Sequence, residues 1–347
     1  MPGLLAWIDR GLSIDEFRRR LQQPDGEWLF ISSPRLNSAV RLEDIEKEFA
    51  GRDSAIVALL SESSIRSERH FPETKPNEQR VPLHRLPGWL RLFASPAEWD
   101  AVVVHRDVVK RMRRPMNGPE PVEEWLLHAV LSGVAVETIE LDDLDNNDRH
   151  DGDEPAKVAH WRKPELLPGS PSRSWMRILL AEFRPETFSR GVRSSVDLTA
   201  LRAGIFQVHD FLDESHELSQ SIEGAGTHRH GDYWHAIMHR REPDYPNAKY
   251  WFRHVGRHPI FAELSQVVTR RVKQLQAKTD RRDENLRARL SQLVDGRGEW
   301  DPFAFVDFCR VCAEGPRADW TAVAEELQWA EMVLLLKATF DDALIVE

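Results

Sequence analysis

Cysteine is nearly absent from this sequence, with only Cys309 and Cys312 among 347 residues. Two cysteines cannot build a disulfide framework, and such scarcity is typical of a protein kept in a reducing compartment. The pair has the C-x2-C spacing, but the sequence has no second pair, which excludes a zinc ribbon of four cysteines. Because both fall inside a helix expected over 303–313, we predict buried side chains rather than a redox centre.

Long hydrophobic runs and phosphate-binding glycine patterns are also missing. No apolar run reaches the roughly 18 residues needed to span a membrane, and the first eleven residues lack the features of a signal peptide. We therefore expect a cytoplasmic protein without a membrane partner. The patterns G-x-G-x-x-G and G-x-x-x-x-G-K-[ST] are absent, which argues against nucleotide sites of those types. The hydrolase signatures G-x-S-x-G and H-E-x-x-H are absent too.

Positive charge is in the minority, with 47 Lys and Arg against 57 Asp and Glu and a formal net charge of −10. This balance does not favour binding to nucleic acid or to an anionic membrane. Apolar residues make up 41% of the chain and charged residues 30%, which is typical of a folded globular protein. The length allows two domains with their own cores, so folding does not require a metal.

The order of helical and extended patterns predicts an α+β protein of two domains. Residues 1–141 alternate between the two patterns, which favours an α/β domain. The expected strands are 27–32, 54–61, 100–105 and 134–141, and the expected helices are 13–22 and 121–131. Residues 142–173 are acidic and then rich in proline, which is typical of an interdomain linker. Residues 174–347 are almost entirely helical in pattern, so we predict an all-α domain of antiparallel helix pairs.

The linker contains an incomplete calcium-binding pattern. Five of its residues match positions of an EF-hand loop: Asp143, Asp145, Asn147, Asp151 and Glu154. The sixth position of the loop holds Asp148, where a sharp turn needs glycine, and a strand rather than a helix is expected before it. We therefore interpret the segment as a solvated acidic linker.

Histidine is concentrated in one part of the expected helical domain, because eight of the fourteen histidines lie between residues 209 and 258. On a helix expected over 197–222, His209, Asp213 and His216 share one face, since they are spaced by four and then three residues. The next helix, expected over 232–241, repeats this spacing with two histidines and a following glutamate. A glycine-rich turn between the helices allows the two sets to face each other.

This arrangement predicts a metal site that catalyses hydrolysis. The expected metal ligands are four histidines, His209, His216, His235 and His239, and the expected catalytic carboxylates are Asp213 and Glu242. Zinc needs three or four N or O ligands at about 2.0–2.2 Å, and a carboxylate can then act as general base on the water that the metal activates. Iron is an equally allowed metal, because residue types do not separate the two. The substrate would be a small phosphoester, amide or ester, and a metal-free polar pocket is the alternative.

A group of polar and aromatic residues follows the histidines, namely Arg240, Arg241, Tyr250 and Trp251. Arginines bind carboxylate or phosphate and aromatic rings stack on ligands, so we predict that these four contact the substrate. Two alternatives stay open. The arginines could instead hold helices together, or the helical domain could be a non-enzymatic scaffold that presents this surface to a protein partner. A hydrolase requires the histidines to converge in a pocket, whereas a scaffold does not.

Two short segments resemble known families. Residues 247–252 resemble the second helix of a Sel1-type or tetratricopeptide repeat, which implies antiparallel helix-pair packing, although no second copy follows at a fixed period. The dipeptide His209-Asp210 is similar to the metal-binding pair of the all-α HD-domain phosphohydrolases. That family also uses a histidine upstream and an aspartate downstream, and the sequence does not identify either.

Overall fold

The computed structural model describes residues 5–9, 13–22, 28–32, 56–61, 86–94, 101–111, 121–134, 136–141, 164–171, 173–276, 281–315 and 318–345. These form two compact units. The first holds the described residues up to 141 together with 181–184, and the second holds 164–180 and the described residues from 185 onward. The incomplete calcium-binding pattern and most of the expected linker lie outside the described residues, so both interpretations stay predictions.

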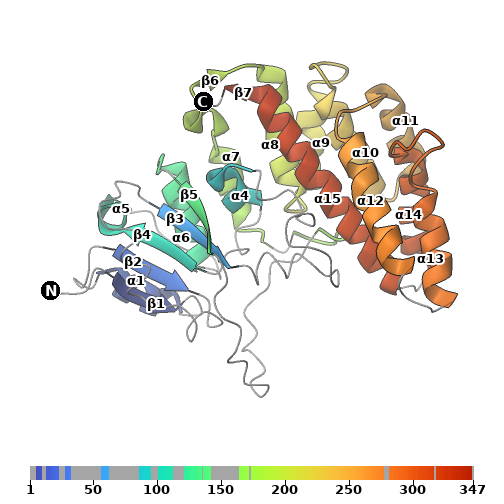
Figure 1. The fold of residues 1–347 in the computed structure, drawn as a ribbon. Coiled ribbons are helices and arrows are strands. Elements are labelled where there is room, and N and C mark those ends of the chain that lie inside the picture. Colours follow the sequence, from blue (N-terminus) through green and yellow to red (C-terminus); the bar gives the residue numbers. More distant parts are fainter. Residues whose placement is uncertain are drawn as a thin grey trace. The chain divides into compact units, whose positions relative to one another are not determined.

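A five-stranded sheet of order β1-β2-β4-β3-β5 lies in the first unit (Figure 1). Its strands are β1 (Leu5–Asp9), β2 (Trp28–Ser32), β3 (Ile56–Ser61), β4 (Ala101–His105) and β5 (Val136–Leu141). β1 is parallel to β2 and β3 is parallel to β5, whereas β4 is antiparallel to both of its neighbours. Four strands coincide with extended runs expected from the sequence, and β1 was not expected.

The helices of this unit are α1 (Ile14–Gln22), α4 (Gly88–Ala94), α5 (Arg106–Arg111) and α6 (Pro121–Leu131). α1 begins where the Glu16 backbone N–H donates to the Ser13 hydroxyl at 3.4 Å, as in the first half of a capping box. α6 is buried over nearly its whole length, and the Trp125 ring lies edge-on to Phe17 at 6.3 Å. Aromatic contacts therefore fix α1 against α6.

Beyond residue 173 the described chain is helical except for a 3-10 turn (Pro185–Phe188) and two paired strands of two residues, β6 (Gly191–Val192) and β7 (Leu344–Ile345). The helices are α7 (Met176–Glu182), α8 (Ser195–Gln207), α9 (Leu212–Gln220), α10 (His230–Arg241), α11 (Tyr245–Val255), α12 (Phe261–Gln276), α13 (Arg281–Ser291), α14 (Pro302–Glu314) and α15 (Ala318–Ala343). The described C-terminal residues are thus mainly helical, as predicted, although the short β6–β7 pair was not expected.

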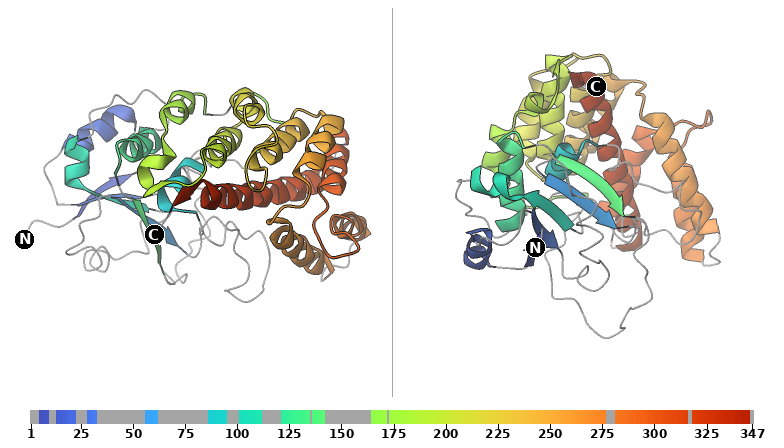
Figure 2. Two further views of the ribbon diagram at one scale, coloured as in Figure 1. Left: turned by 90° about the horizontal axis from the view of Figure 1, so that it is seen from above. Right: turned by 60° about the vertical axis from the view of Figure 1, so that its left-hand side comes forward.

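The core of the helical unit surrounds α10. Helices α8, α9, α10 and α11 lie side by side in chain order, and α15 packs along α8 (Figures 1 and 2). Trp234 of α10 and Trp329 of α15 are among the largest fully buried side chains. Although α15 has 26 residues, no helix of the described chain is long and apolar enough to cross a membrane.

One expected helix is divided in two. The helix predicted over 197–222 ends at Gln207, and α9 begins at Leu212. Asp210 lies between them with a left-handed φ of 66°, which interrupts the helix, and its carboxylate forms an ion pair with Arg241. The Arg241 guanidinium also donates to the Gln207 carbonyl at 2.8 Å, and the same carbonyl accepts from the Asp210 backbone N–H at 3.1 Å. The prediction of one continuous helix was therefore wrong.

The close approach of α8 and α10 requires a glycine. A Cβ at Gly204 would lie 2.4 Å from the Trp234 ring. We expect Gly204→Ala to lower the free energy of unfolding by about 1–3 kcal/mol, because the ring is fully buried and has no room to move. Urea unfolding followed by circular dichroism measures this loss. Gly296→Ala is the control, since its Cβ would have no atom within 4 Å; equal losses would contradict the packing interpretation.

Candidate metal centre

Three of the four predicted metal ligands converge between α9 and α10. His216 lies on α9, and His235 and His239 lie one turn apart on α10. Their possible ligand atoms all fall within 4.8 Å of one another. The His235 ring is 4.7 Å from the His216 ring and 4.8 Å from the His239 ring, measured between centroids. The spacing of four residues on α10 brings the two imidazoles to one face, as the sequence indicated.

His235 is the most unusual member of this group. Its side chain is 1% exposed, and neither ring nitrogen has a hydrogen-bond partner within the part of the chain that the structure describes. The Trp251 ring stacks on it at 3.9 Å, which closes one side of the group. Burial, together with the neighbouring His239 and His216, lowers the pKa of His235 to about 3. The ring is therefore neutral near pH 7, which is the form that binds metals.

Polar groups surround His239 on the side facing α11. The Asn247 side-chain nitrogen lies 3.1 Å from Nε2 of His239, and a carboxylate oxygen of Glu242 lies 3.6 Å from its Nδ1. Burial lowers the pKa of His239 and raises the pKa of the Glu242 carboxyl. The charges of Asp213 and Asp244 raise the pKa of Glu242 as well. Of the two predicted catalytic carboxylates, Glu242 is the one that contacts a histidine of the group.

His209 does not join the group formed by His216, His235 and His239. It lies in the turn between α8 and α9, so the break at Asp210 removes the predicted helical alignment of His209 with Asp213 and His216. Asp210 forms an ion pair with Arg241 instead of joining these histidines. The similarity to the His-Asp pair of HD-domain phosphohydrolases is therefore limited to the sequence.

The two predicted binding arginines are inside the protein. Arg240 and Arg241 are each 1% exposed. Arg240 donates to a carboxylate oxygen of Glu331 on α15 at 2.5 Å, and Arg241 pairs with Asp210. These partners match the structural alternative, in which the arginines hold helices together, and they do not match an exposed surface for a ligand or a partner.

The two predicted aromatic residues differ in exposure. Tyr250 is 46% exposed, whereas Trp251 is 7% exposed and covers His235. Trp251 therefore shields the histidines from water on one side. Tyr250, which lies edge-on to Trp251 at 5.5 Å, is the aromatic side chain that a ligand approaching from solvent can reach.

A second group of possible ligands, not predicted from the sequence, is formed by His228, His230 and Asp342. His228 and His230 precede or begin α10, and Asp342 lies in the last turn of α15. The spacing His-x-His was a usable signal, because it places two imidazoles close together. Asp342 was not predictable from local pattern, since more than 110 residues separate it from both histidines.

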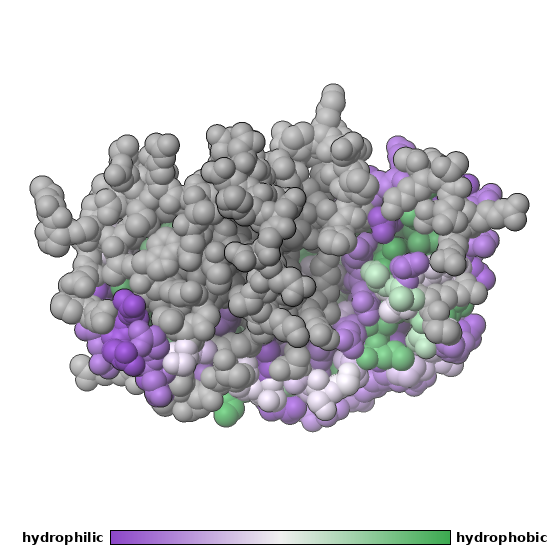
Figure 3. All heavy atoms as spheres, turned by 90° about the horizontal axis from the view of Figure 1, so that it is seen from below, coloured by the Kyte–Doolittle hydropathy of each residue, from purple (hydrophilic) through white to green (hydrophobic). Residues whose placement is uncertain are grey.

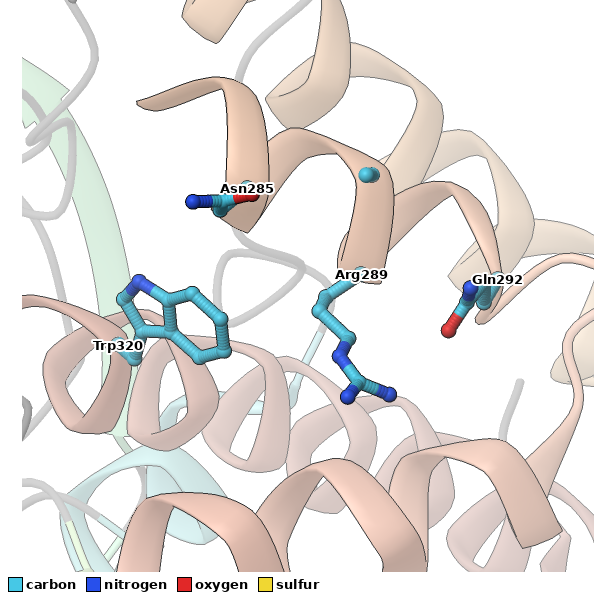
Figure 4. A pocket seen from close by; sticks show the side chains of 5 residues that line it. Asn285, Arg289, Gln292 and Trp320 are labelled. Atoms are coloured by element: carbon cyan, nitrogen blue, oxygen red, sulfur yellow. The ribbon is translucent and has the colours of Figure 1, made fainter. Parts of the chain in front are cut away.

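The pocket shown in Figure 4 is not at either group of histidines. It is lined by four residues on or just after α13 and by one in the first turn of α15, namely Asn285, Ala288, Arg289, Gln292 and Trp320. It has no histidine or carboxylate in its lining, so it does not provide metal ligands. Cys309 and Cys312 are both buried in α14, and burial raises the pKa of Cys309 to about 12, as expected for unreactive thiols.

The chain matches no protein-family model, no curated protein and no solved structure. A functional proposal therefore depends on the geometry and chemistry of the side chains described above.

Proposed function

We propose that His216, His235 and His239 bind one divalent transition-metal ion and that this centre hydrolyses a small ester, amide or phosphoester in the cytoplasm. The observation that supports the proposal best is the buried His235 ring, whose two nitrogens have no hydrogen-bond partner among the residues that the structure describes. A buried polar group without a partner costs about 1–3 kcal/mol, and coordination by a metal would satisfy one of these nitrogens. As part of the proposal, the centre belongs to an all-α domain of antiparallel helix pairs that follows an α/β domain.

The three imidazoles fit zinc or iron, which both accept nitrogen ligands. Three protein ligands leave a position for water, and a bound metal would lower the pKa of that water and polarise the substrate. The electrostatics agree with a cation at this point, because burial favours neutral His235 and His239 while Glu242 and Asp244 lie near His239.

Glu242 is the proposed general base. Its side chain is 41% exposed and lies beside His239, so it is open to water on one side and close to the ligands on the other. In the proposed reaction the water oxygen bonds to the carbonyl carbon or phosphorus, and its proton passes to the Glu242 carboxylate. The bond to the leaving group then breaks, and the proton is returned to the departing atom. The raised pKa of Glu242 suits this exchange.

Glu242→Gln tests the proposed base. We expect hydrolysis of a panel of activated carboxylic and phosphate esters to fall about 10²–10⁴-fold, with bound metal unchanged, since the amide cannot take a proton. His254→Ala is the matched control, because His254 lies in the next helix outside the group and should leave the rate unchanged. Equal rates for Glu242→Gln and the wild-type protein would reject Glu242 as the base. No hydrolysis by a metal-loaded wild-type protein across the panel would reject the reaction class.

The alternative function, a scaffold that binds a protein partner, has less support. Its predicted surface included Arg240 and Arg241, which are buried. In the described chain the exposed large apolar side chains are Leu167, Ile178, Val192, Tyr250 and Ile345. On the face in Figure 3, apolar side chains of the described residues gather at the right, with polar ones beside them.

A further inference from the structure

The side chains of His228, His230 and Asp342 converge on one point, and their possible ligand atoms all lie within 4.8 Å of one another. The Nδ1 atom of His228 lies 2.6 Å, and the Nε2 atom of His230 lies 2.9 Å, from the same carboxylate oxygen of Asp342. Ligands that share an ion at about 2.0–2.2 Å are separated by only slightly larger distances. The His230 side chain is fully buried, whereas His228 and Asp342 are partly exposed, so an ion could enter from solvent.

The local chain conformation favours this convergence. Gly224 and Gly226 have positive φ angles of 66° and 84°, and Arg229 has a left-handed φ of 54°. These angles turn the chain sharply before α10 and place His228 and His230 on either side of Arg229. The end of α15 then brings Asp342 to them. A conformation that L side chains rarely adopt, held at Arg229, is typical of functional sites.

Asp197 provides an independent indication of a cation. Its side chain is 1% exposed, and neither carboxylate oxygen has a hydrogen-bond partner in the described residues. Asp197 lies against the turn that precedes His228, since a Cβ added to Gly226 would be 2.7 Å from one Asp197 carboxylate oxygen. The charge of Asp197 also raises the pKa of His230. A buried carboxylate without a partner is costly unless a positive charge lies nearby.

The usual structural role of an acidic residue at this position does not account for Asp197. It is the third residue of α8, where an acidic side chain can complete a capping box by accepting from the N-cap backbone N–H. The N-cap Ser194 does accept a hydrogen bond from the Asp197 N–H at 3.1 Å. However, the Ser194 N–H donates to the Ala343 carbonyl at 3.2 Å, next to Asp342. The Asp197 carboxylate is therefore left near the histidines without that bond.

His258 supports His230 from the other side. Its Nε2 lies 3.1 Å from Nδ1 of His230, and the Tyr233 ring stacks on it at 4.9 Å. The backbone N–H of Ile260 donates to Nδ1 of His258 at 3.4 Å, so the Nε2–H of His258 donates to Nδ1 of His230. This hydrogen bond fixes the orientation of the His230 ring, whose Nε2 atom lies beside the Asp342 carboxylate.

We propose that His228, His230 and Asp342 bind a second divalent transition-metal ion, such as Zn²⁺, with Asp197 as a nearby balancing charge. Two imidazoles and one carboxylate leave at least one position for water. His230 precedes His235 by five residues, which corresponds to about 7.5 Å along α10. Paired ions of two-metal enzymes lie about 3.5–4 Å apart, so the two groups would be separate sites. The second site does not depend on the proposed hydrolase centre.

Zinc binding to purified variants tests the second site. We expect two equivalents of Zn²⁺ for the wild-type protein in equilibrium dialysis with elemental mass spectrometry. Asp342→Asn should bind one equivalent, His235→Ala/His239→Ala should bind one, and the combined variant should bind none. Asp341→Asn is the matched control, because it changes the adjacent carboxylate, which pairs with Lys337, and should bind two.

The outcomes separate the two proposals. If Asp342→Asn binds as much Zn²⁺ as the wild-type protein, the second site is rejected and the group is a metal-free hydrogen-bond network. If only His235→Ala/His239→Ala retains the wild-type stoichiometry, the first centre is rejected and the second stands.

A second measurement avoids variants that fail to fold. We expect Zn²⁺ to slow modification of His228 by diethylpyrocarbonate at least tenfold in the wild-type protein, measured by peptide mass spectrometry. His254, which lies outside both groups, should react at an unchanged rate. Equal rates at His228 with and without Zn²⁺ would reject the site.

Discussion

Arg240→Ala is expected to lower the free energy of unfolding by about 3–5 kcal/mol, because it leaves the Glu331 carboxylate buried without its counter-charge. Arg240 and Glu331 are 1% and 0% exposed and are joined by a hydrogen bond of 2.5 Å. The Tyr233 hydroxyl, which donates to the other Glu331 oxygen at 2.9 Å, cannot replace the lost positive charge. Urea unfolding followed by far-ultraviolet circular dichroism measures the loss.

Arg257→Ala is the matched control for this prediction. Arg257 also pairs with a glutamate, Glu299, but its side chain is 81% exposed. Exposed ion pairs contribute only about 0.2–1 kcal/mol, so this loss should be small. A second variant, Arg240→Met/Glu331→Met, removes both charges and should recover part of the stability lost in Arg240→Ala. Similar losses in Arg240→Ala and Arg257→Ala would contradict a structural role for the buried pair.

Acid should destabilise the metal-free protein strongly between pH 6.5 and pH 5. Burial lowers the pKa values of both His235 and His258 to about 3, from an ordinary value of 6.5. In this window the unfolded chain binds protons at these histidines and the folded chain does not, so protonation favours unfolding as the pH falls. Each imidazole should then cost about 1.4 kcal/mol per pH unit, or about 2 kcal/mol over the window.

The pH dependence is measured by urea unfolding in the presence of a chelator, so that release of metal does not contribute. His258→Gln should have a slope shallower by about 1.4 kcal/mol per pH unit, whatever its stability at pH 7. A wild-type stability that is constant from pH 6.5 to pH 5 would show that the two buried rings do not resist protonation.

Most helices of the C-terminal unit were predictable because local patterns determine them. Side chains at Ser194, Asp244 and Asp301 accept hydrogen bonds from the first turns of α8, α11 and α14, and such caps are visible in the sequence. The same local rule predicted that His235 and His239 share a face of α10. The strand β1 and the break at Asp210 were not predictable in this way, because they depend on pairing with distant residues, β2 and Arg241.

The roles of the arginines and of Asp342 required the three-dimensional structure. Two adjacent arginines at the end of a helix are equally compatible with ligand binding and with internal ion pairs, and only the position of Glu331 on α15 distinguishes these roles for Arg240. Similarly, His228 and His230 lie near a turn, where polar residues are common. Their possible function became visible because α15 brings Asp342 beside them.

The metal content of the purified protein is the most direct test of the proposed hydrolase centre. Protein prepared without chelators and loaded with zinc or iron should be compared with His235→Ala/His239→Ala by elemental mass spectrometry. We predict that the variant holds one equivalent of metal fewer than the wild-type protein while its circular dichroism spectrum is unchanged. Identical metal content in both proteins, or no uptake of zinc or iron by the wild-type protein, would contradict a metal centre between α9 and α10.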